Sequence, residues 1–515
     1  MDGSNPQSPE RMPLNLSSDS SKDDDYEVSK NEVVLEGFDS VKTHKLVYKD
    51  VLPQIIISCL AHCIVIQAGI NMAYSTILED GLKDTLTTDQ ISWIASLVTL
   101  SLPCGSLFVG PLMDYFGRKK ICIISCIPSI ISWIFLIVAK SEVLIYIARI
   151  IAGISGGLST VSLVYISEIT HPQIRPMLLC FNSIFVSLGI LLTYSLGVWL
   201  AWNQMAIVFL IMNICIFFSL LFIPESPYWI MCFGKGESSQ INHQVETILK
   251  KLNKTEQIYD QELVRIKEVS QNSSNQNNSL VKKMAWFYQQ LKTPTVYKPT
   301  IILLVLFLLQ QLAGTYVIIF YALSVFENLG GSFGKSFDKY DAMVILGILR
   351  FLMSVLTSFS SKNYGRRFLC ITSGLGMAFS MFFSAMYFYL TSAVDENGQT
   401  KEVMADQKWI LLVLVLFYVC TSCIGFVIIP WTLIGELLPI SVRGIMGGFL
   451  VSAAYVMMFG VTKTYPYLVK ALGAQGLFYF FSVTSLIGAT FVYVFLPETL
   501  GKSFAEIEKY FDKKD

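Results

Sequence analysis

Charged side chains are scarce in this sequence. They make up 15% of its 515 residues, whereas soluble domains carry about 25%. Hydrophobic residues make up 53%, and the formal net charge is +0, so we expect no general attraction to polyanions. This composition excludes a soluble enzyme, a nucleic-acid-binding protein and a disordered chain.

Several chemical signatures are also missing. No Cys/His spacing indicates a zinc site, and most of the 11 cysteines lie in or beside apolar runs. There is no Gly-rich loop followed by Lys and Ser/Thr, so we expect no ATP site. The apolar runs contain no paired catalytic set, so we expect no enzymatic activity, cofactor or metal. The first 50 residues lack the apolar core of a signal peptide, and we expect the first apolar run to direct membrane insertion.

What the sequence does contain is about twelve apolar runs of about 22 residues, each long enough to cross a bilayer. Lipid offers no partner to an unpaired backbone group, and these runs are too long and too evenly apolar for barrel strands. We therefore predict an all-α membrane protein. The predicted spans are 52–74, 91–113, 121–139, 143–167, 176–200, 204–223, 298–326, 341–360, 368–391, 409–436, 444–469 and 475–496.

The predicted spans fall into two groups of six, separated by a polar stretch. We predict a disordered N-terminal segment at 1–50, a six-helix half at 51–223, a linker at 224–297, a second six-helix half at 298–496 and a tail at 497–515. Lys and Arg gather after the even-numbered spans, as in Arg118-Lys119-Lys120. Acidic residues outnumber Lys83 between the first two spans. By the positive-inside rule, both termini and the linker are expected in the cytosol.

Three charged landmarks occur in both groups, in the same order. Gly117-Arg118-Lys119 recurs as Gly365-Arg366-Arg367, and Pro224-Glu225-Ser226 recurs as Pro497-Glu498-Thr499. Glu168 and Arg175 recur as Glu436 and Arg443 with the same spacing of seven residues. Parallel repeats of this kind are a transporter plan, in which substrate binds between the halves near mid-membrane.

On these residues the chain resembles the sugar porter family of the major facilitator superfamily, over almost all of residues 50–511. The segment Gly110 to Lys120 is similar to the loop signature of that superfamily, and Arg149 with Gly153, Gly156 and Gly157, Gln310-Gln311-Leu312 and Pro430-Trp431 extend the likeness. The insect facilitated trehalose transporters look most similar, on Val461–Thr464 and Gly435–Pro439. The resemblance implies the major facilitator fold and a sugar substrate.

The resemblance also implies a latch of salt bridges at the cytosolic helix ends. Carboxylates and guanidinium groups can form bidentate bonds that hold these ends together while the external side is open. The positive-inside rule alone would explain the arginines, but not the matched glutamates. The predicted network comprises Asp114, Arg118, Arg149, Glu168, Arg175, Glu225, Arg366, Arg367, Glu436, Arg443 and Glu498.

Sugar recognition needs amides, hydroxyl groups and an aromatic face. The resemblance assigns hexose contacts to Gln310 and Gln311, and it places Trp431 under the sugar. A glutamine bond between helices and an interfacial tryptophan are the alternatives. The predicted substrate residues are Gln310, Gln311, Trp431, Asn71, Ser183 and Tyr316.

Several positions depart from the family pattern. Ser183 stands where the family has glutamine, and Tyr316 stands where it has asparagine, so the substrate need not be glucose. Lys362, Tyr228, Pro176 and Ile428 are further departures. Arg350 lies in the eighth span with no carboxylate nearby in sequence. A sugar hydroxyl, a glutamate partner and snorkelling to the helix end remain open for it.

Asn71 bears on the mechanism, because the proton-coupled sugar porters that this chain resembles carry an aspartate there. An amide cannot carry a proton. His62, the one titratable candidate in the first span, is more typical of a packing residue. We therefore expect facilitative uniport of trehalose or a hexose across the plasma membrane. A proton–sugar symporter and a sugar receptor that does not transport are the alternatives. The expected partners are a sugar and the lipid bilayer, without nucleic acid or ATP.

Overall fold

The computed structural model describes residues 51–512, except 172, 235–236, 254, 257, 261, 265, 268–287, 329–337, 362, 392–408, 440–441 and 503. Predictions for residues 1–50, for Lys362 and for most of the linker therefore lie outside the described residues. Within them, the fold is built from helices, and eleven are long and apolar enough to cross a membrane. The all-α membrane fold predicted from the apolar runs is confirmed.

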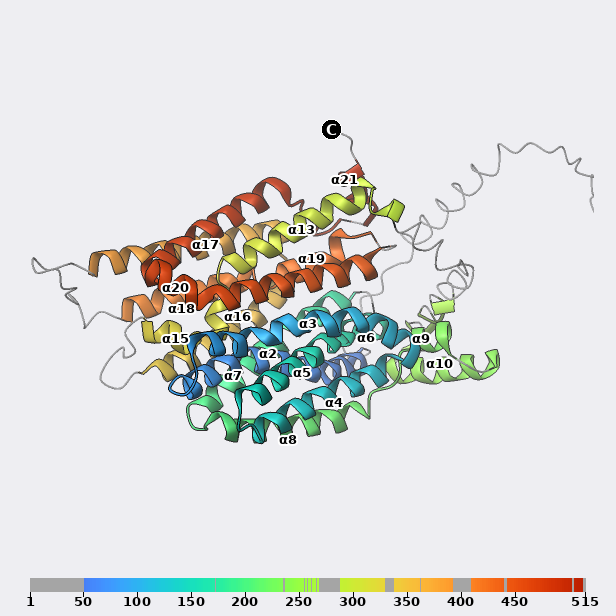
Figure 1. Ribbon diagram of the computed structural model, residues 1–515. Coiled ribbons are helices and arrows are strands. Elements are labelled where there is room, and N and C mark those ends of the chain that lie inside the picture. The colour runs from blue at the N-terminus through green and yellow to red at the C-terminus, as the bar shows by residue number, and fades with distance from the viewer. Residues whose placement is uncertain are drawn as a thin grey trace, which may run out of the picture. The chain divides into compact units, whose positions relative to one another are not determined.

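Seven helices make up the described part of the chain before the linker (lower part of the bundle in Figure 1). Their bounds are α2 Leu52–Leu82, α3 Thr88–Phe116, α4 Arg118–Ile137, α5 Glu142–Leu158, α6 Val161–Ile169, α7 Arg175–Gly197 and α8 Trp202–Leu220. Helices α5 and α6 together form one span. The linker contributes α9 Pro227–Phe233 and α10 Ser238–Leu252.

The part after the linker forms the second group of helices (upper part in Figure 1). Their bounds are α13 Pro294–Leu312, α14 Val317–Phe320, α15 Ala322–Asn328, α16 Lys339–Ser360, α17 Arg366–Thr391, α18 Trp409–Ile424, α19 Ile429–Leu437, α20 Arg443–Phe495 and α21 Phe504–Asp512. Helix α20 contains Gly473 at φ 68°, a left-handed conformation that favours glycine. The two last predicted spans are thus continuous helix apart from one kink.

The helix bounds correct the sequence prediction in two places. Helix α2 continues to Leu82, so Glu79 and Asp80 lie on its last turn and not in the loop where the sequence placed them. The predicted span 298–326 is broken into α13, α14 and α15. Pro176, which departs from the family pattern, lies in the first turn of α7, where a missing backbone N–H is tolerated.

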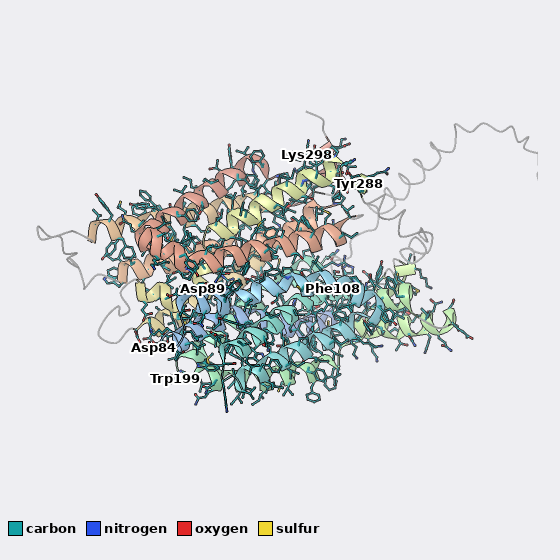
Figure 2. The ribbon with its side chains drawn as sticks, in the orientation of Figure 1. Asp84, Asp89, Phe108, Trp199, Tyr288 and Lys298 are labelled. Carbon is teal, nitrogen blue, oxygen red and sulfur yellow. The ribbon has the colours of Figure 1, made fainter. Side chains whose placement is uncertain are left out.

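Close helix crossings hold each group together. A Cβ atom on Gly69 of α2 would lie 2.0 Å from the carbonyl oxygen of Val186 in α7, and one on Gly189 would lie 2.2 Å from that of Ile66. Small residues allow such close packing in lipid, where no hydrophobic effect drives helices together. Large apolar side chains on the flanks stay exposed, for example Phe108 and Trp199 (Figure 2), as expected for a surface that faces lipid.

The two groups meet along two pairs of helices. Helix α3 packs against α20, and α7 packs against α16. Serine pairs join both contacts. Ser106 and Ser452 are 3.2 Å apart between α3 and α20, and Ser187 and Ser354 are 2.7 Å apart between α7 and α16. The two ends of this bundle are named here by what they carry: the linker end, with α9, α10 and α21, and the opposite end, with α15 (right and left in Figure 1).

Candidate functional site

The first charged cluster lies at the linker end of the first group. Arg118 Nη2 lies 2.9 Å from Glu168 Oε1, and its Nε donates to both carboxylate oxygens, at 3.1 and 3.0 Å. Asp114 pairs with the same guanidinium at 3.1 Å. Glu168 also accepts a 2.5 Å hydrogen bond from the Ser226 hydroxyl. The cluster thus ties α3, α4 and α6 to the segment that opens α9.

Glu225 completes this cluster through backbone contacts. Its carboxylate accepts hydrogen bonds from the backbone N–H of Lys119, at 3.0 Å, and of Ser226, at 2.9 Å. A Cβ atom on Gly117 would lie 2.4 Å from Glu225 Oε2, so only glycine leaves room for this carboxylate at the start of α4. A carboxylate at a helix N-terminus is also stabilised by the helix dipole.

The second group repeats this arrangement. Arg366 Nη2 lies 3.1 Å from Glu436 Oε1, and the hydroxyl of Thr499 donates to Glu436 at 2.5 Å. Glu498 accepts from the backbone N–H of Arg366, at 2.8 Å, and of Arg367, at 3.2 Å. As with Gly117, a Cβ atom on Gly365 would clash with the carboxylate, at 2.1 Å from Glu498 Oε2.

The remaining predicted network arginines bind backbone carbonyls. Arg175 donates to Thr170 O at 2.8 Å, and Arg443 donates to Leu438 O at 2.9 and 3.2 Å. Both carbonyls end the preceding helix, five residues earlier. The guanidinium of Arg367 donates to the Tyr493 carbonyl. The network therefore contains two sets of ion pairs: Arg118 with Asp114 and Glu168 in the first group, and Arg366 with Glu436 in the second.

Arg149 lies apart from both sets. It is fully buried, and it donates to the carbonyl oxygens of Ile94, at 3.1 Å, and Asn71, at 2.9 Å, and to the Ser75 hydroxyl. It therefore joins α5 to α2 and α3. The structure does not bring it to the linker-end carboxylates with which the sequence analysis grouped it.

The two predicted glutamines are buried on α13, but only one has an open atom. Gln310 donates through Nε2 to the carbonyl oxygens of Phe426, at 2.5 Å, and Val427, at 3.3 Å. These carbonyls lie in the break between α18 and α19 and have no helical partner there. Gln311 donates to Gln310 Oε1 at 3.3 Å, and its own Oε1 has no partner among the described residues.

The other predicted substrate residues come from both groups. Trp431 donates from Nε1 to the Tyr316 hydroxyl at 3.2 Å, and its ring lies 5.0 Å from that of Phe307. Asn71 is 4% exposed, and its Oδ1 has no hydrogen-bond partner in the described part of the chain. Ser183 is half-buried on α7. The indole, the phenol and these open amide oxygens are the groups that a polyol would use.

The opposite end carries charged pairs of a different kind. Lys339 lies 3.0 Å from Asp80, and Lys83 lies 3.4 Å from Glu327. The Tyr340 hydroxyl donates to Asp80 at 2.5 Å. The hydrogen bond to Asp80 raises the pKa of Lys83. Each of these pairs joins α2, or the residue after it, to the second group.

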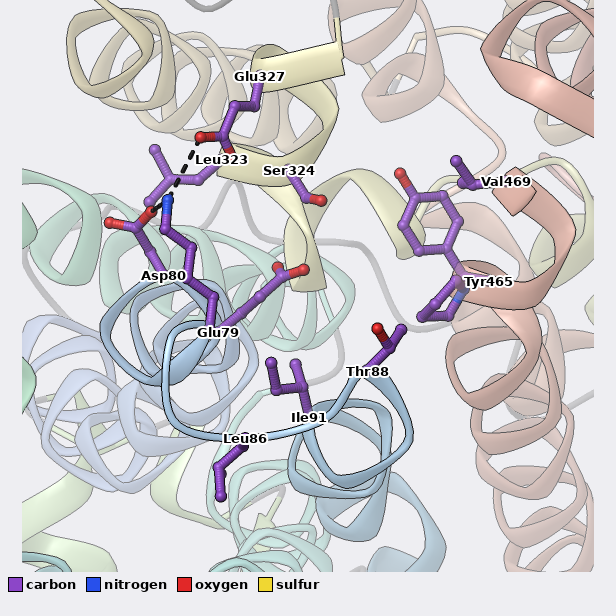
Figure 3. Close-up of a pocket in the computed structure, with 12 residues that line it drawn as sticks. Glu79, Asp80, Leu86, Thr88, Ile91, Leu323, Ser324, Glu327, Tyr465 and Val469 are labelled. Carbon is purple, nitrogen blue, oxygen red and sulfur yellow. Dashed lines mark hydrogen bonds and ion pairs between the residues drawn. The ribbon is translucent and has the colours of Figure 1, made fainter.

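A second contact of the same kind lies between α3 and α20. Lys463 lies 2.7 Å from Asp89, and the Tyr467 hydroxyl donates to the same carboxylate at 2.5 Å. Figure 3 shows the cavity between these contacts, whose volume is about 320 Å³. Residues from both groups line it, including Glu79, Ser324 and Tyr465.

Sequence reasoning missed the charged residues of this end. Asp80, Asp89 and Lys83 were read only as a local balance of charge, and Lys339 was not singled out. A signal was present in the acidic residues that lie within one turn of two helix ends. Their partners lie more than 240 residues away, so spacing along the chain does not identify them.

Elsewhere, Tyr228 stands at the position where the family pattern has arginine. Burial raises the pKa of Tyr228 to about 12, so its hydroxyl stays neutral. The arginine's charge is therefore not replaced there.

Comparison with known proteins gives a consistent result. The family model described as "Sugar (and other) transporter" matches residues 41–511. The facilitated trehalose transporter Tret1 of Apis mellifera ligustica is 27% identical over 439 residues, which are 83% of this chain and 80% of that protein. The Tret1 protein of Bombyx mori is 28% identical over 443 residues, 85% of this chain and 83% of its own length.

Solved structures with the same fold include two of the symporter XylE. The proton:xylose symporter bound to 6-bromo-6-deoxy-D-glucose has a TM-score of 0.69 and 22% identity, and covers 90% of this chain and 99% of its own. The inward open form from E. coli has a TM-score of 0.68 and 20% identity, and covers 89% and 99%. The expectation of a major facilitator fold is confirmed.

Proposed function

Because the chain belongs to the sugar (and other) transporter family, we propose that it carries trehalose or a hexose across the plasma membrane as a facilitative uniporter. The choice of sugar rests on the relatives, which are named for trehalose. The halves 51–223 and 298–496 alternately open at either end of the bundle. Both termini and the linker lie in the cytosol, so the linker end is the cytosolic end.

The observation that supports this proposal most is a pair of open polar atoms, one in each group of helices. Gln311 Oε1 and Asn71 Oδ1 are buried acceptors without partners in the described chain. A buried polar atom without a partner is destabilising by about 1–3 kcal/mol. Sugar hydroxyl groups would donate to both. The Trp431 ring, held by its bond to Tyr316, offers an apolar face to the C–H side of a sugar.

The charge distribution supports uniport over proton coupling. Asn71 presents an amide to the interior, and Asp and Glu of the described spanning helices lie within one turn of a helix end. His62 binds the Leu178 carbonyl at 2.8 Å and lies 5.4 Å from the Phe185 ring, as expected for a packing residue. The described spanning helices therefore carry no aspartate or glutamate in their middle turns.

One observation favours the proton-coupled alternative. Glu79 is half-buried on the last turn of α2, lines the cavity of Figure 3, and has no hydrogen-bond partner at Oε2 in the described residues. It faces Ser324 and lies near Asp80, Lys83 and Glu327. A proton on Glu79 would change the charge between the two groups of helices at the opposite end.

Uptake of labelled trehalose and glucose by oocytes that express the full chain tests the proposal, with and without a proton ionophore. We expect saturable uptake that the ionophore leaves unchanged and that Gln311→Ala lowers by at least about tenfold, as expected for loss of one buried hydrogen bond. Gln204→Ala is the matched control, because Gln204 is exposed and only caps α8.

Each other outcome has its own meaning. Uptake that the ionophore abolishes, together with loss of that response in Glu79→Gln, would establish proton coupling instead. Binding of sugar without uptake, at normal surface expression, would favour a receptor. Neither uptake nor binding of any sugar would refute the proposal.

A further inference from the structure

Arg350 lies at the middle of α16, and only 3% of it is exposed. It does not snorkel to a helix end, which was one of the possibilities that the sequence left open. The neighbouring positions on this face of α16 contact α7. A Cβ atom on Gly347 would lie 3.2 Å from Leu191, and the hydroxyl groups of Ser354 and Ser187 form a hydrogen bond. Arg350 therefore lies on the face of α16 that meets the first group of helices.

No carboxylate compensates the charge of Arg350. Within the described residues it forms no ion pair, and its Nε has no hydrogen-bond partner. The acidic residues of the described spanning helices all lie within one turn of a helix end, whereas Arg350 lies about three turns from either end of α16. An unpaired charge in the middle of a membrane protein is costly and is usually functional.

Arg149 shows what a structural arginine looks like in the same bundle. Its guanidinium donates to two carbonyl oxygens and one hydroxyl, which hold it in place. Arg350 has no comparable set of acceptors. The groups that interact with its charge include the phenols of Tyr194 and Tyr316 and the thiol of Cys423. Tyr316 in turn accepts the hydrogen bond of Trp431, so Arg350 lies close to one of the predicted substrate residues and its partner.

We propose that this site takes a sugar acid, a hexose-sized polyol with a carboxylate, and that Arg350 binds the carboxylate. The inference rests on the proposed transport of sugars by this chain, and it adds a sugar acid to the substrates proposed above. The planar guanidinium matches a carboxylate with two parallel hydrogen bonds. The hydroxyl groups of the same molecule donate to the open oxygens of Gln311 and Asn71. A neutral sugar would leave the buried cation without a counter-charge.

The test measures ligand binding to the purified full-length chain in nanodiscs, through tryptophan fluorescence and thermal shift. The probes are glucuronate, glucose, trehalose, and acetate with chloride as simple anions. We expect glucuronate to bind at least about tenfold more tightly than glucose, the size of effect that one hydrogen bond to a charged group gives. Arg350→Gln should remove this preference while it changes glucose binding by less than about threefold.

Two further variants keep the test decisive. Arg350→Lys retains the positive charge but not the two parallel donors of the guanidinium, and it should retain part of the preference for glucuronate over glucose. Lys502→Gln removes an exposed positive charge outside the spanning helices and should change nothing. If Arg350→Gln does not fold, the comparison of probes on the unaltered chain and on Arg350→Lys still decides.

Three results would overturn the inference. Equal binding of glucose and glucuronate by the unaltered chain would do so, and so would a preference that survives in Arg350→Gln. Binding of acetate or chloride as tightly as glucuronate would mean an anion site that does not recognise a sugar. Uptake of neutral sugar alone would leave the proposed function standing, whereas a folded chain that binds no sugar of either kind would remove both.

Discussion

The two ends of the bundle both carry charged clusters, but one end has ion pairs within each group of helices and the other has ion pairs between the groups. At the linker end, Arg118 with Glu168 and Arg366 with Glu436 each connect helices of one group. At the opposite end, Asp80 with Lys339 and Asp89 with Lys463 connect one group to the other. Pairs inside a group can stay intact while the groups rock, whereas pairs between groups must break before that end opens.

This difference changes how we interpret the charges at the linker end that recur in both groups. From the family resemblance we expected the linker-end charges to form a latch between the cytosolic helix ends. In the structure Arg118 with Glu168 and Arg366 with Glu436 each join helices of one group, whereas the pairs at the opposite end join the two groups. The predictions below separate these two kinds of cluster, in order of decreasing expected effect.

Glu168→Gln should have the largest effect. Arg118 and Glu168 have side chains only 5% and 11% exposed, so the variant leaves a buried guanidinium with only the half-exposed Asp114 as counter-ion. Breaking such a pair destabilises by about 3–5 kcal/mol. Glu436→Gln should cost less, because the Glu436 side chain is 27% exposed. The midpoint of thermal unfolding in detergent measures both, and an equal loss in the two variants would contradict this ranking.

Thr76→Val should have the next largest effect. The Thr76 hydroxyl donates to Ile319 O at 3.1 Å and accepts from Ala322 N–H at 3.0 Å, so it ties α2 to the broken span α14–α15. Valine keeps the shape and removes both bonds, which weakens the closed opposite end by about 1–3 kcal/mol.

The measurement for Thr76→Val is the rate at which an introduced Ser324→Cys thiol reacts with an impermeant reagent added outside. Ser324 lines the cavity at this end. Thr85→Val is the control, because the Thr85 hydroxyl bonds only Leu82 O, three residues earlier. No acceleration over the parent, which lacks the Thr76 change, would show that this contact does not hold the end closed.

Asp80→Asn should act in the same direction but more weakly. It removes the charge that pairs with Lys339 and Lys83, and such partly exposed pairs contribute up to about 1 kcal/mol. The same thiol reaction should accelerate by at most about fivefold.

Two charge-matched variants serve as controls for Asp80→Asn. Asp84→Asn lies at the same end without an ion pair among the described residues, and Asp114→Asn lies at the linker end within one group. Acceleration by either would undermine the distinction between the clusters.

Ser187→Ala should have the smallest effect. It removes the hydrogen bond to Ser354 between α7 and α16, at a loss of about 0.5–1.5 kcal/mol that the remaining packing partly offsets. Transport should keep its apparent KM within about twofold, because loss of one hydroxyl leaves the predicted substrate side chains in place. A loss of uptake as large as that of Gln311→Ala would mean that substrate reaches this serine.

Much of this architecture follows from the sequence, because a bilayer permits few folds. Apolar runs predicted the spanning helices, and the repeated Glu–Arg spacing predicted two equivalent clusters. The extension of α2 to Leu82 did not follow, since Asp80 gains partners there, Lys339 and Tyr340, that come from the second group and lie far away in the sequence. Which group supplies the partner of Arg118 also depends on three-dimensional packing.

The candidate site divides in the same way. The residue types of Gln310, Gln311 and Trp431 indicated a polyol site, and the site residues stay predictions until binding is measured. The sequence did not reveal that the Gln310 side-chain N–H donates to the carbonyl oxygen of Phe426 in the break before α19. The side-chain oxygen without a partner among the described residues is therefore that of Gln311. The isolation of Arg350 from every described carboxylate likewise required the positions of the helix ends.

The serine pairs along the seam between the two groups have a consequence for the rate of movement. In Ser106–Ser452 and Ser187–Ser354 either hydroxyl can donate. A serine hydroxyl can exchange one hydrogen-bond partner for another nearby, and no large side chain has to leave a close-fitting pocket. The two groups can therefore move past each other along this seam over low energy barriers. The energy barrier to relative movement of the two groups then comes mainly from the charged contacts of the opposite end. Turnover should therefore respond to ionic strength, which screens those partly exposed charges, more than to solvent viscosity along the seam.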